Sequence, residues 1–579
     1  MSRLKNIFRQ VPIRKPKRNI FDLSFDNLLT VNFGDLCPVM CKEVIPGDTW
    51  QVQSTTMVRF APMLAPIMHR CNVYVHYFFV PNRILWSDFE DFITGGKDGT
   101  ADPTLPYVDL QDFDIEDDDH LAYVSPGSLW DYLGLPTLPN AETAGEDYMT
   151  ALGKVSLLPF AGYRKIYEDY YKDQNLEDEF DVKEFVDTYG SSGVTLTQMY
   201  QDFGLRRRAW EKDYFTSALP WPQRGGDVHL PLTGDADVFF DPQDGKSPIL
   251  RTREGATMGS AWNPLPETAH DFGHYIGPDV DGNLRMYGEE FNQQAMENEV
   301  QISGVSNGAI GGIDPNGTLK ADMSDVTSAT INELRRSLRL QEWLEKNARS
   351  GARYIEQILS HFGVRSSDGR LDRAEYLGGG KIPVQISEVL QTSETTENSP
   401  LADMGGHGIS VGNSAKFRKF FEEHGYVFGI MSIIPRSSYG NGVPKHFTKF
   451  DKFDFAWPEF ANLGEQEIKC LELNMQPTKA ANDKVFGYTP RYAEYKFSLN
   501  EFHGDFRTNM AFWHLGRMFP NGHEIKLNSD FVHVNPESDK DNLNRIFAVQ
   551  ESDENHLWVE IFNRITVKRT LPKFGVPTL

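Results

Sequence analysis

The sequence predicts a mainly β protein in which strands near both ends of the chain enclose long helical and loop insertions. Its 579 residues include 48 Gly and 33 Pro, a content typical of many turns and loops rather than of a helical bundle. Strand-like alternation occurs near both ends of the chain, and the clearest helical pattern lies between them. A hydrophobic content of 40% is ample for a buried core, which excludes disorder over most of the chain.

Three elements are expected in the first hundred residues. Residues 47–60 begin with a turn and continue in loose polar and apolar alternation, which predicts a strand. Residues 71–80 alternate and then become apolar on both faces, which predicts a half-buried strand that Pro81 ends. Residues 84–93 have the pattern of a short amphipathic helix closed by Gly95.

The stretch from about 98 to 190 has the composition of an acidic insertion. Its carboxylates cluster near residues 109–119 and 177–184, so this stretch is expected to face solvent. Weak calcium binding by the first cluster is an alternative, but the glycine and glutamate of an EF-hand loop are missing. Helical spacing within the insertion predicts a helix on the flank of the β scaffold, carried by Tyr163, Ile166, Tyr167, Tyr170 and Tyr171.

The clearest helical region covers residues 327–362. Thr330 and Glu333 form a capping-box pattern, Gly351 is placed to break the region in two, and Gly363 can close it. Apolar residues recur there at spacings of three, four and seven: Ile331, Leu334, Leu338, Leu344, Ile355, Ile358, Leu359 and Phe362.

The last third of the chain returns to strands. Residues 426–435 form an apolar run of strand length, and residues 557–569 alternate more cleanly. The length alone suggests about four domains. However, no linker or internal repeat divides the chain. We therefore expect a basic N-terminal arm over 1–21 and one domain over 22–579.

The sequence contains no expected targeting or membrane segment and few cysteines. The basic start lacks an apolar segment behind it, so it is not a signal peptide, and no run of about 18 apolar residues predicts a membrane helix. Four cysteines, at 37, 41, 71 and 470, are too few and too irregular to staple the chain. A reduced, cytoplasmic setting fits them better than secretion.

The net charge of −24 means that a polyanion would be repelled by the molecule as a whole. Any nucleic-acid contact must therefore be local. The strongly basic region is the arm, which has no acidic residue before Asp22 and is interrupted by Pro12 and Pro16, so an extended conformation is favoured over a helix. The candidate nucleic-acid-binding residues are Arg3, Lys5, Arg9, Arg14, Lys15, Lys17 and Arg18. A solvated terminus without such a role is the alternative.

Several short motifs match patterns found in enzymes, but the residues around them lack the features that each pattern requires. Residues 408–412 match G-x-S-x-G, but the residues before them have the composition of a flexible loop rather than a buried strand. Residues 378–381 lack the upstream glycine of a phosphate-binding loop and are expected to form a turn. Glycine and nearby prolines oppose a helix at residues 270–274, and Cys37 and Cys41 are not at zinc-site spacing. No catalytic residue, cofactor or metal is predicted.

Motifs in a fixed order along the chain resemble those of the microvirus major capsid proteins, the gokushovirus-like Microviridae. The resemblance begins with the run from about residue 22 to Gly96. Only 98–190 and 227–326 lack matching motifs. The matching segments are EVIPGDT at 43–49, FFVPNR at 78–83, ALPWPQ at 218–223, residues 334–362, EYLGGG at 375–380, EHGY at 423–426, VFGY at 485–488 and RYAEY at 491–495.

The resemblance implies a viral jelly roll, an eight-stranded antiparallel β-barrel with large insertions. It also implies a T=1 icosahedral shell of about sixty copies around circular single-stranded DNA. Residues 227–326 would form an outward protrusion used in host attachment, since their turn sequences at 279–283, 306–308 and 314–317 suit a surface loop.

The resemblance extends to partners and location. The implied partners are a small basic DNA-packing protein, a pilot protein, scaffolding proteins and a host surface receptor, without membrane insertion. The protein would reside in the virion after assembly in the host bacterial cytoplasm.

Two other functions stay open at this point. A carbohydrate-binding or glycoside-hydrolysing β protein would need a pair of carboxylates near aromatic residues, but the many carboxylates single out no pair. A non-assembling receptor-binding spike would share the loops but form a small oligomer. Assembly would need aromatic residues exposed at the contacts between subunits. The candidates are Trp86, Trp221, Trp457, Trp513, Phe455 and Phe519, although each of these could equally be part of the buried core.

Overall fold

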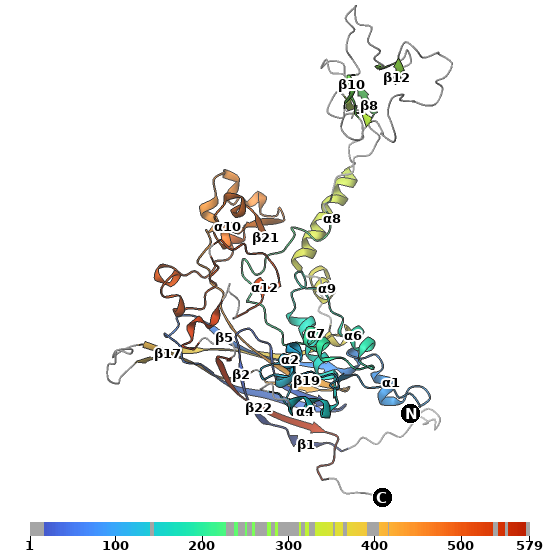
Figure 1. Ribbon diagram of the computed structural model, residues 1–579, viewed down its shortest axis with the longest axis vertical. Helices are drawn as coiled ribbons and strands as arrows, with labels where there is room; N and C mark the ends of the chain where they lie inside the picture. Colours follow the sequence, from blue (N-terminus) through green and yellow to red (C-terminus); the bar gives the residue numbers. More distant parts are fainter. Residues whose placement is uncertain are drawn as a thin grey trace, which may run out of the picture. The chain divides into compact units, whose positions relative to one another are not determined.

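A computed structural model describes residues 17–138, 144–226, 228, 331–350, 354–362, 367–390, 404–414, 416–520, 522–536, 542–549 and 554–574, with seven short strands between Asp237 and Asp322. The chain divides into two compact units. One comprises Met1–Gly225 with Trp343–Leu579, and the other comprises Gly226–Glu342. The two antiparallel sheets described next belong to the first unit (Figure 1).

Sheet 1 joins the two ends of the chain. Its strands follow the order β1-β22-β4-β17-β16, while β2 also pairs with β22 and β18 also pairs with β4. Asn19 lies opposite Arg569 and Phe25 lies opposite Asn563, which confirms that strands far apart in sequence pair. The strands are β1 (Asn19–Asp22), β2 (Phe25–Val31), β4 (Thr49–Phe60), β16 (Gln385–Leu390), β17 (Met404–Asn413), β18 (Phe417–Phe420) and β22 (Leu557–Arg569).

Sheet 2 has the order β15-β5-β19-β3. Its central strands β5 and β19 are buried on both faces. The expectation that residues 71–80 form a half-buried strand is therefore wrong, because packed side chains cover both sides of this sheet. The strands are β3 (Cys37–Val44), β5 (Cys71–Pro81), β15 (Glu375–Pro383) and β19 (Gly425–Pro435).

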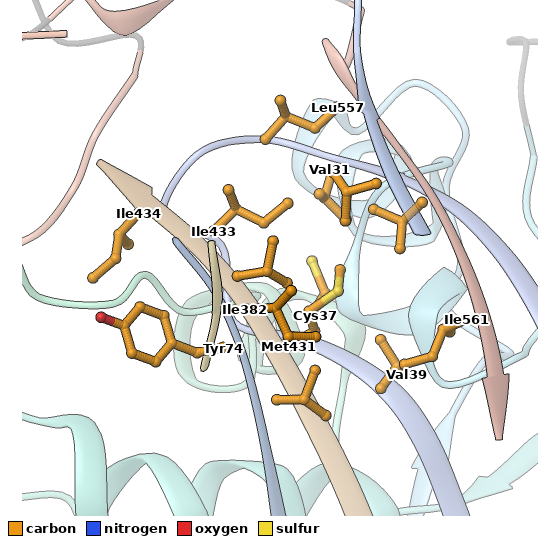
Figure 2. Close-up of a cluster of buried hydrophobic side chains, with 14 of the residues drawn as sticks. Val31, Cys37, Val39, Tyr74, Ile382, Met431, Ile433, Ile434, Leu557 and Ile561 are labelled. Carbon is orange, nitrogen blue, oxygen red and sulfur yellow. The ribbon is translucent and has the colours of Figure 1, made fainter. Parts of the chain in front are cut away.

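The main core lies between the two sheets. Side chains of β2 and β22 in sheet 1, such as Val31 and Ile561, meet side chains of sheet 2, such as Val39 and Met431 (Figure 2). Burial alternates residue by residue along β4 and β22, as the sequence pattern predicts for strands with one core face and one solvent face. This alternation leaves the other face of sheet 1 exposed.

A helical layer covers the second face of sheet 2. Phe78 and Phe428 pack there against side chains of the insertion, including Tyr163 and Ile166. The helix α5 approaches β19 so closely that a Cβ on Gly162 would lie 2.8 Å from the Phe428 ring. The helices of this layer are α1 (Phe89–Thr94), α2 (Asp118–Val124), α3 (Leu129–Tyr132), α4 (Ala144–Leu152), α5 (Leu158–Ile166), α6 (Val182–Tyr189) and α7 (Leu196–Asp202).

The insertion between 98 and 190 is thus only partly a solvent-facing segment. Its acidic residues are mostly at the surface, and Asp117 caps α2 by accepting hydrogen bonds from the backbone of Asp119 and His120. Its apolar residues are buried against sheet 2. A two-stranded sheet, β6 (Tyr107–Asp109) with β7 (Lys154–Ser156), and the π-helical turn η2 (Tyr167–Tyr171) complete it. The short turn η1 (Asn82–Ile84) precedes the insertion.

The expected helical region contains two helices, α8 (Ile331–Ser350) and α9 (Tyr354–Phe362). Thr330, Gly351 and Gly363, which the sequence assigns to its capping and breaks, lie outside the described residues. Between 227 and 326 the described strands pair as β8 with β14, β9 with β10 and β13, and β11 with β12. Their bounds are β8 Asp237–Phe240, β9 Ile249–Arg251, β10 Thr257–Ser260, β11 Tyr275–Pro278, β12 Leu284–Tyr287, β13 Gly312–Ile313 and β14 Leu319–Asp322.

A third core packs residues 214–218 against residues that connect β19 to β22. It gathers Phe215, Tyr439, Phe486 and Phe531 around Arg517, whose guanidinium lies 4.2 Å from the Phe531 ring centroid. Its regular elements are β20 (Glu465–Lys469), β21 (Val485–Pro490), α10 (Cys470–Leu473), α11 (Lys479–Asn482) and α12 (Ser529–Val532). Short 3-10 turns occur at η4 (Asp368–Arg370), η5 (Lys445–Thr448), η6 (Lys452–Asp454), η7 (Pro458–Phe460), η8 (Ala493–Tyr495), η9 (Gly504–Arg507), η10 (Ala511–Trp513) and η11 (Leu543–Ile546).

Candidate nucleic-acid interface

The root of the basic arm lies at the edge of sheet 1. Lys17 and Arg18 are exposed and directly precede β1. The Arg18 guanidinium lies 5.1 Å from the ring centroid of Phe420 in β18, and Asn19 Nδ2 donates a hydrogen bond to the carbonyl oxygen of Leu571. Residues 19–21 therefore belong to the sheet. The other arm candidates lie outside the described residues: Arg3, Lys5, Arg9, Arg14 and Lys15.

Sheet 1 places further cations beside this root. Arg564 and Lys568 occupy exposed positions of β22, and Arg418 occupies an exposed position of β18. Gln51 of β4 lies opposite Thr566 on one side and opposite Arg418 on the other, so the cations point from the same face of the sheet. We call Arg18, Arg418, Arg564 and Lys568 together the basic face.

Two exposed carboxylates, Asp22 of β1 and Asp26 of β2, lie on the same part of the sheet, opposite Thr566 and Phe562 of β22. Hydrogen bonds from the Ser24 hydroxyl and backbone N–H hold the pKa of Asp22 below its ordinary value, and Arg564 adds to the shift. Asp22 is therefore ionised at neutral pH. Four cations against these two anions leave a local positive excess on a chain whose net charge is −24. Such an excess attracts phosphate groups at short range.

The sequence pattern does not reveal Arg418, Arg564 and Lys568 as a group. They lie on two strands far apart in the chain. Strand register alone brings them together. Alternation did predict that Arg564 and Lys568 would share the polar side of their strand, which is the only sequence signal for this site.

The serine of the G-x-S-x-G match does not lie on a nucleophile elbow. Ser410 is in the middle of β17, is 3% exposed, and donates its hydroxyl hydrogen to the carbonyl oxygen of Pro383 at 3.0 Å. The next described element along the chain is the strand β18, whereas an elbow leads into a helix. The expectation of a loop before Ser410 is wrong, because Met404–Asn413 is a strand whose small residues fit closely against neighbours.

Residues 378–381 form part of a strand, not the expected turn. They lie in β15 beside β5, with a bulge between Tyr376 and Gly378. A Cβ on Gly379 would lie 2.5 Å from a carbon of the His76 ring, so close packing of the two strands requires this glycine. Lys381 Nζ donates to Glu211 Oε1 at 2.9 Å and is thus engaged in an ion pair.

No group of three or more His, Cys, Asp or Glu side chains is placed to hold a metal ion among the described residues. All four cysteines are free, and burial raises the pKa of Cys41 to about 12, which keeps it as a neutral thiol. Residues 270–274 lie outside the described residues. In the described parts of the chain, no helix has both the length and the apolar content to cross a membrane.

The six aromatic candidates for assembly contacts fall into three groups. Trp86 and Phe519 are buried in cores, and Trp221 and Trp513 are half-buried. Phe455 and Trp457 are 53% and 46% exposed, so only these two present most or half of their rings to solvent.

Comparisons with known proteins cover nearly the whole chain. The family model described as "Capsid protein (F protein)" matches residues 9–579. Capsid protein VP1 of Bdellovibrio phage phiMH2K is 34% identical over 579 residues, which span 98% of this chain and 97% of that protein. Capsid protein VP1 of Chlamydia phage 1 is 31% identical over 100% of this chain and 98% of that protein. Capsid protein VP1 of Spiroplasma virus 4 is 28% identical over 95% of this chain and 93% of that protein.

These similarities define the class of the protein as viral and structural. The chain belongs to the capsid protein (F protein) family of microviruses, as the motif order predicts. It is a major capsid protein and therefore a component of the virion.

Proposed function

We propose that this chain assembles through contacts with its own copies into a T=1 icosahedral shell that encloses a circular single-stranded DNA genome. The observation that carries the proposal is similarity to three capsid proteins along almost the entire chain. Closed shells need one chain to present complementary surfaces repeatedly, and T=1 symmetry requires about sixty copies.

We propose further that the two sheets form a jelly roll. Its eight main strands follow the chain as β2, β3, β4, β5, β15, β17, β19 and β22. Sheet 1 holds β2, β4, β17 and β22, and sheet 2 holds the other four. Consecutive strands alternate between the sheets except for β5 and β15, which pair within sheet 2. This order, with the first strand beside the last, is what two Greek keys folded over one core require. The shared core between the sheets supports the assignment.

The arm and the basic face together suit the backbone of single-stranded DNA. Binding through phosphates has little base preference and is strongly weakened by salt, by roughly 0.7 in the slope of log K per neutralised phosphate. Seven arm cations would give a slope of about −5 at most. The basic face extends this cationic path from the arm root onto sheet 1.

We propose that residues 227–326 form an outward protrusion used in host attachment. Support comes from the separation of Gly226–Glu342 as a compact unit of its own and from short strands joined by turn-rich sequence. Loops and small insertions on a rigid scaffold more often serve recognition than stability. A covering element for a neighbouring subunit is the competing role for this segment.

A net charge of −24 gives a physical reason for additional partners. Confined DNA must be neutralised by other cations, and a small basic DNA-packing protein would supply them. The proposal also includes a pilot protein, scaffolding proteins, a host receptor, and assembly in the bacterial cytoplasm. The chain acts as a structural protein, not as an enzyme.

Size-exclusion chromatography and negative-stain imaging of the expressed chain, alone and with its viral partners, test the proposal. Uniform particles of about sixty copies are expected. A small defined oligomer would favour a receptor-binding spike. A persistent monomer that cleaves or binds glycans would favour the carbohydrate-acting alternative.

A further inference from the structure

Residues 445–463, which we call the aromatic segment, present large apolar side chains to solvent. They connect β19 to β20 and contain the turns η5, η6 and η7. Phe450 is 91% exposed and Phe447 is 67% exposed. The others are Phe453 at 52%, Phe455 at 53%, Trp457 at 46% and Leu463 at 61%. Monomeric soluble proteins rarely carry so many exposed apolar side chains in one place.

Two lysines of the aromatic segment point inward, whereas its large apolar side chains lie outside. The side chain of Lys449 is only 5% exposed; its Nζ lies 2.9 Å from Glu494 Oε1 and donates to the Tyr495 hydroxyl. Lys445 Nζ donates to Glu472 Oε1 and to the carbonyl oxygen of Glu467. These polar anchors replace an apolar core beneath the segment and leave the rings outside.

Local hydrogen bonds fix the rings in place before any partner arrives. Asp454 Oδ2 accepts hydrogen bonds from the backbone N–H groups of Phe450 and Asp451 at 2.9 and 2.8 Å. Trp457 Nε1 donates to the carbonyl oxygen of Lys452 at 2.8 Å. A surface ordered in this way loses little conformational entropy when it is covered.

The charge of the aromatic segment indicates which partner covers it. Lys445 and Lys449 are already paired with Glu472 and Glu494, so the charges that the segment exposes are Lys452 and three carboxylates, at 451, 454 and 459. Two copies of a chain with a net charge of −24 repel each other, so contact between them is favoured at apolar surface such as these exposed rings. Single-stranded DNA would instead require a surplus of cations beside the rings.

We propose that the aromatic segment is a contact surface for a second copy of this chain. The five rings offer on the order of 600 Å² of surface. A stable interface buries about 800 Å² per partner, so the rings would form most of one contact. The inference rests on the proposed shell function and identifies one surface through which the subunits meet.

The test compares assembly of three proteins: the unchanged chain, the double variant Phe447→Ser/Phe450→Ser, and Lys452→Ser as a matched control in the same segment. Both phenylalanines are mostly exposed, so the melting temperature of the unassembled double variant should equal that of the unchanged subunit. The double variant should need at least about tenfold more subunit to form particles, and Lys452→Ser should not. Hydroxyl-radical footprinting should show Phe450 and Trp457 protected in particles of the unchanged chain.

Each other outcome overturns the inference. If the double variant assembles at the same concentration and Phe450 reacts equally in particles and free subunits, the contact lies elsewhere. If it assembles normally but packages less DNA, the surface binds nucleic acid. If the unchanged chain never assembles, the proposed shell function fails and this inference fails with it. If the unchanged chain and the double variant assemble equally well, only this inference is refuted and the proposed shell function stands.

Discussion

Ile561 and Ile20 show how position alone decides what one side chain contributes to sheet 1. Ile561 of β22 is fully buried between the sheets, whereas Ile20 of β1 is 63% exposed. Removal of a buried side chain costs its transfer free energy and leaves a cavity. The exposed isoleucine loses little on truncation.

Ile561→Ala should lower the free energy of unfolding by about 2–5 kcal/mol, and the matched variant Ile20→Ala should change it by less than about 0.5 kcal/mol. Urea unfolding of the unassembled subunit measures both values. Equal effects of the two substitutions would contradict the assignment of the core face of sheet 1.

Glu494 anchors the aromatic segment and makes its stability depend on pH. Burial by itself raises the pKa of Glu494, but hydrogen bonds from Gln466 and Lys449 outweigh it and hold the pKa below the ordinary 4.5. Because the folded-state pKa is the lower one, the ionised carboxylate stabilises the fold above about pH 4.5. That contribution is lost as the pH falls through the folded-state pKa.

The melting temperature of the unassembled subunit should therefore fall between pH 5 and pH 3, and it should fall less in Glu494→Gln. Glu459→Gln, in the exposed part of the same segment, serves as the control and should keep the full decrease. Differential scanning calorimetry at both pH values decides the question. An identical decrease in melting temperature in all three proteins would mean that Glu494 does not cause the pH dependence.

The basic face is an element-scale feature, since strands β18 and β22 and the arm root each supply only one or two of its cations. Arg418→Gln/Arg564→Gln/Lys568→Gln should reduce the DNA content of particles while empty shells still form. The salt slope of log K for single-stranded DNA should weaken by about 2, from roughly 0.7 per lost phosphate contact.

A matched set of exposed lysines away from this face, Lys97→Gln/Lys479→Gln/Lys526→Gln, should leave the slope unchanged. Fluorescence titration with labelled oligonucleotide at several salt concentrations gives both slopes. Equal weakening by the two sets would mean that total charge, not the basic face, controls binding.

The sequence predicted the elements whose two faces differ and missed those rich in glycine. Alternation identified β4 and β22 correctly because each strand has one core face and one solvent face. β15 and β17 resembled loops, yet their glycines serve close packing: a Cβ on Gly406 would lie 2.3 Å from the carbonyl oxygen of Ala65. Such contacts depend on residues distant in sequence, so local composition could not reveal them.

The basic arm was visible as a run of charge, whereas the basic face depends on strand register. The sequence identified only two residues of the aromatic segment, Phe455 and Trp457, as candidates for assembly contacts. Whether a ring is covered depends on the fold around it, as the burial of Trp86 and Phe519 shows. The sequence could therefore name candidate aromatic residues but could not separate contact surface from core.

At the scale of the whole molecule, the proposed function assigns different tasks to the two units of the chain. The two-sheet unit would build the shell, and residues 227–326 would recognise the host. Replacement of that segment by a Gly/Ser linker should preserve particles and reduce adsorption to host cells, as measured by cell-bound particle counts. A folded but non-assembling product would make the segment an assembly element instead.

The central claim is that copies of this chain close into a small icosahedral shell. Cryo-electron microscopy of particles purified from cells that express the chain with its viral partners tests this most directly. The account predicts a uniform T=1 reconstruction of about sixty copies, with sheets 1 and 2 facing each other in every subunit and the aromatic segment covered by a neighbour. Particles of another symmetry, or only monomers and small oligomers under every condition, would contradict it.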